Sequence, residues 1–425
     1  MERPVTRRRF VQATSGGLAV GVAGCLGSDD DDDDAGGNGD GHDHDDHGDD
    51  DHDHGDDDHD HNDETATDAP GSDGLAYAFA PDRIAIVDPE AGEVVDELTD
   101  GISSAEWGDT RLTRDRDKIF AIENSLEQVV VIDTETRELI ERVDIGPGAT
   151  HMYHPVEDEM WAHADDEGAF YVIDTDSLVV TEIVDAGLEG EGHGKLLAHE
   201  DFGTKAYATN VNDPAALIVD LEAYERTGSI DLGEEGGTHY KAYAPRTGLA
   251  YFERSGGVGT TAVVDTATDE VVDELPFSGG MSLTPDEERM GILDGDELHL
   301  LDMTDEESEE IGSVTVEGGP DALGYHEVDG TLYGFTANTT TPDVAVVDVD
   351  ALEVVDRLEA GDIERPDGAH HLHRSGVAGG GYFFTPADAD GTVAVVDMDA
   401  RALVGQVPVG EGVARVQFVG GGTER

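Results

Sequence analysis

The sequence has very few lysines and only one cysteine. The lysines are Lys118, Lys195, Lys205 and Lys241, and Lys and Arg together number 24 against 99 Asp and Glu in 425 residues. The formal net charge is −75. A surface this acidic would repel phosphate, which argues against nucleic acid as a partner. Because Cys25 is the sole cysteine, the chain cannot form an internal disulfide.

The acidic residues are not confined to one segment, and self-repulsion of such a charge destabilises a compact fold in dilute salt. At molar salt the Debye length shrinks to about 3 Å, and most of this penalty disappears. We interpret the surface as halophilic, of the haloarchaeal type.

The N-terminus has only a short apolar run, residues 18–23, which is too short for a permanent membrane span. Residues 6–12, TRRRFVQ, fit the twin-arginine export pattern, and residues 22–25, VAGC, resemble a lipobox. We predict a signal peptide over residues 1–28 and lipid attachment at Cys25. The protein would then be anchored on the outer face of the cytoplasmic membrane. The alternative is an uncleaved N-terminal anchor with an incidental cysteine.

Residues 29–73 are low in large apolar side chains and rich in Asp, so we predict a disordered tether. Its histidines are His42, His44, His47, His52, His54, His59 and His61. Several form His-x-His pairs that can share one ion, with aspartate oxygens completing the shell. We predict a flexible metal-binding segment that raises the metal concentration near the following domain. The alternative is an acidic spacer whose histidines have no role.

Residues 74–425 contain eight copies of one pattern, such as IAIVDPEAGEVVDEL from Ile84 and VAVVDVDALEVVDRL from Val344. Each copy has an apolar strand, a turn led by Asp and a second strand, with two further β-like segments before the next copy. The leading residues are Asp88, Asp133, Asp174, Asp220, Asp265, Asp302, Asp348 and Asp397. Four strands per repeat predict an all-β, eight-bladed β-propeller in which these aspartates cap turns.

The first repeat lacks an innermost strand, because LAYAFA, residues 75–80, is only its second strand. The C-terminal segment ARVQFVG, residues 414–420, is an additional strand at the position where the innermost strand of a repeat is expected. We predict that it joins the N-terminal blade and closes the ring, which leaves no open sheet edge.

Four histidines occupy one equivalent position on the innermost strands, where they would meet in the central channel. They are His151, His193, His239 and His370, whereas other blades carry Glu106 or Trp107, Met281, Ala322 and Val413 there. Further candidate ligands nearby are His154, His326, His371 and His373. The remaining histidines, His163, His199 and His299, lie at other positions of the repeat, and we interpret them as structural or surface residues.

Imidazole is a suitable ligand for zinc, copper, nickel and iron, and zinc takes three or four such ligands. The fourth ligand could be a histidine, an Asp or water. Zinc binding should weaken below about pH 6.5, because the imidazoles must be deprotonated. The alternative is that each histidine caps a strand.

The motifs GATHMYH, GEGHGK, GGTHYK and DGAHHLH, together with the His-x-His pairs, resemble the AztD-type zinc metallochaperones of AztABC zinc importers. This resemblance implies a non-enzymatic propeller that binds zinc and passes it to the substrate-binding protein of a zinc ABC transporter. It implies ligation by His151, His193, His239 and His370, with His371 and His373 as substitutes. The blades also resemble the broad YVTN-like propeller class.

Two other functions compete with zinc binding. A copper or quinone oxidoreductase is one, because GAHHLH superficially resembles the copper centre of nitrous oxide reductase. That enzyme class needs paired cysteines, and quinoprotein blades are rich in tryptophan, whereas this chain has only Trp107 and Trp161. A non-catalytic cell-surface propeller that binds protein or carbohydrate is the other.

Overall fold

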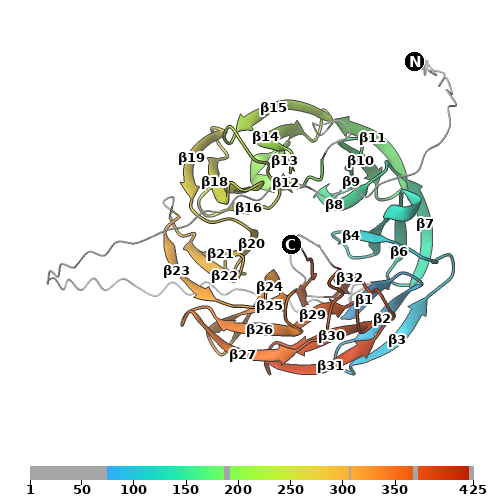
Figure 1. Ribbon diagram of the computed structural model, residues 1–425. Helices are drawn as coiled ribbons and strands as arrows, with labels where there is room; N and C mark the ends of the chain where they lie inside the picture. The colour runs from blue at the N-terminus through green and yellow to red at the C-terminus, as the bar shows by residue number, and fades with distance from the viewer. Residues whose placement is uncertain (1–73, 186–191, 306–307, 367–371, 421–425) are drawn as a thin grey trace, which may run out of the picture. The chain divides into compact units, whose positions relative to one another are not determined.

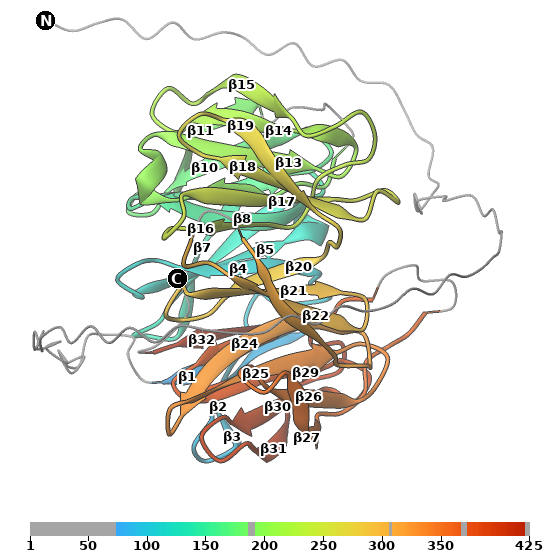
Figure 2. The same cartoon turned by 90° about the vertical axis from the view of Figure 1, so that its left-hand side faces the viewer.

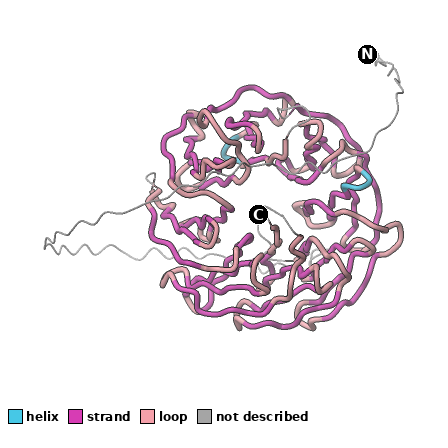
Figure 3. Tube along the Cα trace, viewed as in Figure 1, coloured by secondary structure: helices cyan, strands magenta, loops and turns pink. Residues whose placement is uncertain are grey.

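The computed structural model describes residues 74–185, 192–305, 308–366 and 372–420. In these residues 32 strands form eight four-stranded antiparallel sheets around a common axis (Figures 1 and 3). The predicted eight-bladed β-propeller is confirmed. The predicted signal peptide, lipid attachment and tether fall in residues 1–73, outside the described residues.

The strands of the eight blades occupy four concentric positions. The innermost strands are β32 (Arg415–Val419), β4 (Trp107–Leu112), β8 (Ala149–Val156), β12 (Leu196–Ala198), β16 (Lys241–Ala244), β20 (Gly280–Leu283), β24 (Pro320–Val328) and β28 (Val377–Gly379). The second strands are β1 (Leu75–Ala80), β5 (Lys118–Glu123), β9 (Glu159–Ala164), β13 (Lys205–Asn210), β17 (Leu249–Arg254), β21 (Arg289–Asp294), β25 (Thr331–Asn338) and β29 (Tyr382–Ala387). The third strands are β2 (Arg83–Asp88), β6 (Gln128–Asp133), β10 (Ala169–Asp174), β14 (Asp213–Asp220), β18 (Thr260–Asp265), β22 (Glu297–Asp302), β26 (Asp343–Asp348) and β30 (Thr392–Asp397). The outermost strands are β3 (Glu93–Leu98), β7 (Glu138–Asp144), β11 (Val179–Asp185), β15 (Glu225–Asp231), β19 (Glu270–Leu275), β23 (Glu310–Thr315), β27 (Glu353–Glu359) and β31 (Ala402–Pro408).

The third strands are almost continuously apolar because both faces of each sheet are covered by neighbouring blades. In β2, for example, Ile84 and Val87 are completely buried. The turn after each third strand is capped by its last residue, as in β2, where the Asp88 carboxylate accepts from the backbone N–H groups of Glu90 and Ala91. All eight repeat aspartates accept such a bond, which confirms their structural assignment.

The ring is closed by the pairing of the two ends of the propeller. Strand β32 lies antiparallel beside β1, in register from Leu75 opposite Val419 to Phe79 opposite Arg415 (Figures 1 and 2). This pairing supplies the innermost strand that the first repeat lacks, and it confirms the predicted closure. The hydrophobic cores lie between neighbouring sheets, so each blade holds the innermost strand of the next in position.

Helical structure is limited in the described residues to two short 3₁₀ turns, η1 (Asn124–Leu126) and η2 (Glu200–Phe202). None of the described helices has the length and apolar character needed to cross a membrane.

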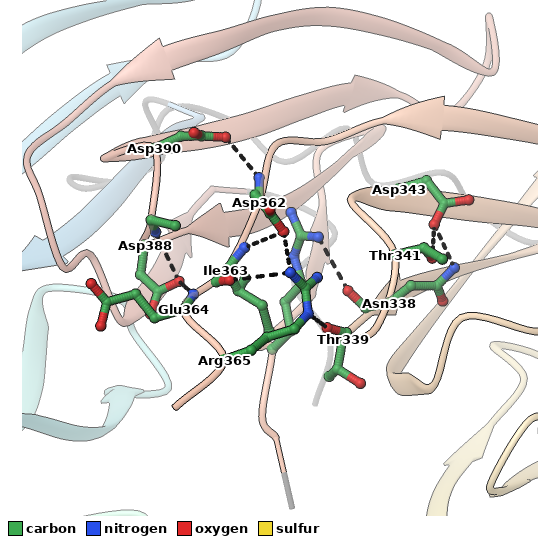
Figure 4. A network of polar contacts seen from close by, with 12 residues as sticks. Asn338, Thr339, Thr341, Asp343, Asp362, Ile363, Glu364, Arg365, Asp388 and Asp390 are labelled. Carbon is green, nitrogen blue, oxygen red and sulfur yellow. Dashed lines mark hydrogen bonds and ion pairs between the residues drawn. The ribbon is translucent and has the colours of Figure 1, made fainter. Parts of the chain in front are cut away.

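A polar network anchors the polypeptide on both sides of residues 367–371, which are outside the described residues. Before them, the Arg365 guanidinium donates to the Thr339 carbonyl, and the backbone N–H of Asp362 donates to Asp390 (Figure 4). After them, the buried Arg374 guanidinium donates to the carbonyl groups of three residues and to one hydroxyl. These acceptors are Asn338, Ala360, Pro386 and the Thr385 hydroxyl.

Candidate metal centre

Three of the predicted histidines come together from three consecutive blades. His151 lies on β8, His193 lies shortly before β12, and His239 lies shortly before β16. One ring nitrogen of each lies within 4.8 Å of the corresponding nitrogens of the other two. We call these three residues the histidine triad. Hydrogen bonds to their backbone carbonyl groups fix its two non-strand members, because Val211 N–H donates to the His193 carbonyl and the Thr209 hydroxyl donates to the His239 carbonyl.

The nitrogen atoms of the triad are arranged as metal ligands would be. The Nε2 atoms of His151 and His193 are 3.1 Å apart. Two ligands on a tetrahedral zinc ion, with bonds of 2.0–2.1 Å, are separated by roughly 3.3–3.4 Å. Nε2 of His239 is buried and has no hydrogen-bond partner among the described residues. Because a buried polar atom without a partner is costly, this orphaned nitrogen fits a metal-binding site.

Two carboxylates orient the first two rings of the triad. Asp109 on β4 lies 2.9 Å from Nδ1 of His151, and Asp165 lies 2.9 Å from Nδ1 of His193. A carboxylate on one ring nitrogen fixes the tautomer and directs the other nitrogen towards the metal, as in the carboxylate–histidine pairs of zinc proteins. The Asp165 carboxylate also accepts from the Thr150 hydroxyl at 3.0 Å and lies 2.6 Å from Nδ1 of His163.

The electrostatics favour neutral imidazoles at His151 and His239 and ionised carboxylates at Asp109 and Asp165. Burial lowers the pKa of His151 to about 4, although the negative charge of Asp109 partly opposes this effect. Burial and the charge of Lys195 hold the pKa of His239 well below its usual range. Burial alone would raise the pKa of Asp109, but the neighbouring His151 and cationic side chains hold it well below its usual range. His151 and His239 are therefore in the protonation state that metal binding requires.

Three further candidate ligands of the described residues, His154, His326 and His373, do not belong to this group. Nδ1 of His373 lies 3.3 Å from the Asp321 carboxylate, and its side chain is 57% exposed. His373 is close enough for its charge to lower the pKa of His239. His154 lies 2.8 Å from the Glu157 carbonyl, and His326 lies 2.8 Å from the Asp399 carboxylate. His370 and His371 are outside the described residues, as are the seven histidines of residues 42–61.

The two orienting carboxylates and His163 were not predicted as parts of the site. His163 is buried and structural, as expected, but it supports Asp165 and so contributes to the position of His193. A signal for Asp109 exists, because 42 residues separate Asp109 from His151 and 42 also separate His151 from His193. Counting back one blade from His151 therefore reaches Asp109, whereas the strand alignment pointed to Glu106 or Trp107.

The fold and the site together define an eight-bladed β-propeller with a carboxylate-supported histidine triad contributed by innermost-strand segments. No known protein family matches the sequence, and no curated protein matches it. Solved structures do match the fold. AztD from Citrobacter koseri superposes with a TM-score of 0.60 at 12% identity, over 83% of this chain and 98% of AztD.

Two other propellers show how widely the fold occurs. Dihydro-heme d1 dehydrogenase NirN, solved in complex with DHE, has a TM-score of 0.65 at 13% identity, over 84% of this chain and 77% of NirN. The computationally designed protein Ika8 has a TM-score of 0.56 at 12% identity, over 73% of this chain and 89% of Ika8. At these identities the similarities establish the fold alone.

Proposed function

We propose that this chain is an extracytoplasmic zinc-binding protein that stores zinc or acts as a metallochaperone. The observation that carries the proposal is the convergence of His151, His193 and His239, with carboxylates behind two rings and an orphaned buried nitrogen on the third. Neutral imidazoles supported by second-sphere carboxylates are a typical zinc ligand set. The resemblance of the histidine motifs to AztD-type zinc metallochaperones, and the similarity of the fold to AztD, support the same function.

In this function the triad supplies three ligands and leaves a fourth position for exchange. His370, His371 or His373, an Asp or water would complete the coordination of the ion. A site with an open position releases its ion by direct ligand exchange with an acceptor more readily than a closed four-ligand site does. This favours transfer over a purely structural role for the metal.

The histidine-rich residues 42–61 would capture zinc and supply it to the triad. His42, His44, His47, His52, His54, His59 and His61 offer several weak ligand sets on the same polypeptide. Tethering raises the local concentration of bound ions near the channel without any additional contact.

The proposed location and partner follow from the N-terminus and from the resemblance. Export by the twin-arginine route and acylation of Cys25 would anchor the protein on the outer face of the cytoplasmic membrane. The acceptor would be the substrate-binding protein of a zinc ABC transporter. Metabolic labelling of Cys25 with a fatty acid analogue, and its loss in Cys25→Ser, would test the anchor.

Zinc titration by calorimetry tests the site directly. The full chain is compared with a variant in which residues 39–61 are replaced by glycine and serine, which we call the tail-replaced variant. We expect the tail-replaced variant to keep one tight zinc site and to lose the weaker sites. His151→Ala/His239→Ala in the same background should lose the tight site, whereas His154→Ala/His326→Ala is the matched control and should keep it. The proposal is wrong if the tail-replaced variant binds no zinc.

An oxidoreductase is the competing function, because NirN, a dehydrogenase, shares the propeller fold. Copper loading separates the two. A copper-dependent visible absorption band with reversible reduction would favour the oxidoreductase, and zinc binding without redox turnover would favour the metallochaperone. A propeller with no response to any metal would instead be a surface binding protein for protein or carbohydrate.

A further inference from the structure

Three residues of the metal centre are each followed, two positions later in the sequence, by a basic residue. Arg111 follows Asp109 on β4, Lys195 follows His193, and Lys241 follows His239. In extended chains residues i and i+2 point to the same side. The chain is extended and paired here, because the Lys195 carbonyl accepts from Thr209 N–H just as the His193 carbonyl accepts from Val211 N–H. The cations therefore form a second layer beside the triad.

Within the described residues, these three cations form no ion pair with a carboxylate, unlike the other two lysines. Of the four lysines, Lys118 lies 2.7 Å from Asp117, and Lys205 lies 2.6 Å from Asp269. Lys195, Lys241 and Arg111 form no ion pair within 4.0 Å with any carboxylate of the described residues. In a sequence with 99 acidic residues, three basic side chains without such an ion pair therefore lie close to the triad.

Aromatic rings, rather than carboxylates, hold the two lysines. Lys195 Nζ lies 4.6 Å from the ring centre of Tyr240, and Lys241 Nζ lies 5.7 Å from the ring centre of Tyr153. Cation–π contacts position an ammonium group without neutralising it. The cations also act on one another, since the charges of Lys195 and Arg111 add to burial in lowering the pKa of Lys241 to about 7.

A bound metal ion would add to this positive charge, because three neutral imidazoles do not offset the two charges of a divalent ion. Asp109 and Asp165 are the carboxylates that contact the triad. Asp321 and Glu253 act on Lys195 at longer range. Arg111 and Lys195, together with Lys241 as an ammonium or as an amine, offer hydrogen-bond donors to a further ligand on the ion, so the loaded site retains a place for an anion.

We propose that the channel binds a small carboxylate or oxyanion together with the metal, one oxygen taking the open coordination position and the others facing Arg111, Lys195 and Lys241. This inference rests on the proposed metal centre and names the chemistry of its fourth ligand. The anion at the open coordination position could come from a free small molecule or from an aspartate of residues 39–61 of the same chain. We propose that it is a free small molecule.

Cobalt(II) in place of zinc gives a direct optical test, because its visible spectrum reports changes of coordination. The full chain and the tail-replaced variant are loaded with cobalt and titrated with sodium acetate, with sodium perchlorate holding the ionic strength constant. We expect a saturable spectral change in both proteins. Lys195→Met/Lys241→Met should require roughly tenfold or more acetate. Lys205→Met, whose lysine has its own carboxylate partner, is the matched control and should respond as the unmodified protein does.

The outcomes distinguish failure of this inference from failure of the metal centre. If cobalt does not bind to the tail-replaced variant, the metal centre itself is wrong. If cobalt binds but acetate leaves the spectrum unchanged, or acts equally in the double lysine variant, the anion site is refuted and the metal centre stands. If only the tail-replaced variant responds to acetate, the anion site stands but the proposal of a free ligand is refuted. In that case an aspartate of residues 39–61 occupies the site in the full chain.

Discussion

The carboxylate of Asp165 offers the sharpest test of how the metal centre is built. Its two oxygens lie within hydrogen-bond distance of three groups. These are Nδ1 of His163 at 2.6 Å, Nδ1 of His193 at 2.9 Å and the Thr150 hydroxyl at 3.0 Å. In Asp165→Asn one oxygen becomes an NH₂ group that cannot accept. One of the two imidazoles then faces a donor and must change its tautomer. If that ring is His193, its Nε2 becomes protonated and cannot bind zinc.

The expected losses can be given for both affinity and stability. Removing a second-sphere carboxylate typically weakens metal binding 10–100-fold, which corresponds to about 1.4–2.8 kcal/mol. The Asp165 side chain is 14% exposed, so solvent replaces its hydrogen bonds poorly. Loss of a hydrogen bond to a charged group costs about 1.5–3 kcal/mol of unfolding free energy.

Calorimetric zinc titration and urea unfolding of the tail-replaced variant, with and without Asp165→Asn, measure these two quantities. Asp174→Asn is the matched control, because Asp174 ends β10 of the same blade and caps a turn at Ser177. Asparagine also caps such turns, so affinity and stability should stay close to those of the parent protein. Zinc affinity in Asp165→Asn equal to that of the control would refute the proposed role of this carboxylate.

Three further predictions concern the triad and the ring. His239→Ala should lower zinc affinity at least 100-fold in calorimetry but change the unfolding free energy by only about 1 kcal/mol, because Nε2 makes no hydrogen bond in the described residues. The pKa of His151 is about 4 in the fold and about 6.5 in the unfolded chain, so the unfolded chain binds more protons between these values. His151 should therefore contribute a fall of about 3 kcal/mol in the unfolding free energy from pH 6.5 to pH 4, and the fall measured in urea titrations should be smaller by about this amount in His151→Gln. Arg374→Met removes the guanidinium donor from three buried carbonyl groups and should cost roughly 3 kcal/mol or more in the same assay. A loss below about 1 kcal/mol would contradict this.

The propeller could be predicted because each blade repeats local rules. The runs that end at Asp88 and Asp348 are apolar, β-branched and followed by a capped turn, and this chemistry needs no knowledge of the rest of the chain. Ring closure was also predictable, since an unpaired first strand and a spare last strand have one evident solution. The short innermost strands β12 and β28 are harder to identify from sequence, because they have three residues each and their pairing depends on neighbouring blades.

The site could be predicted only where its residues are rare in the sequence. Histidines at a common position stand out, and three of the four proposed principal ligands form the triad. Asp109 and Asp165 are two among 99 acidic residues. The 42-residue blade spacing points to Asp109, whereas only the packing of one blade against the next selects Asp165. The predicted weakening of zinc binding near pH 6.5 applies to exposed imidazoles, whereas burial lowers the pKa of His151 and His239. Acidification to about pH 5 should thus protonate histidines of ordinary pKa first and shift zinc from the predicted histidine-rich tether towards the triad. A zinc-loaded full chain that loses triad-bound zinc before it loses its weaker sites would contradict this order.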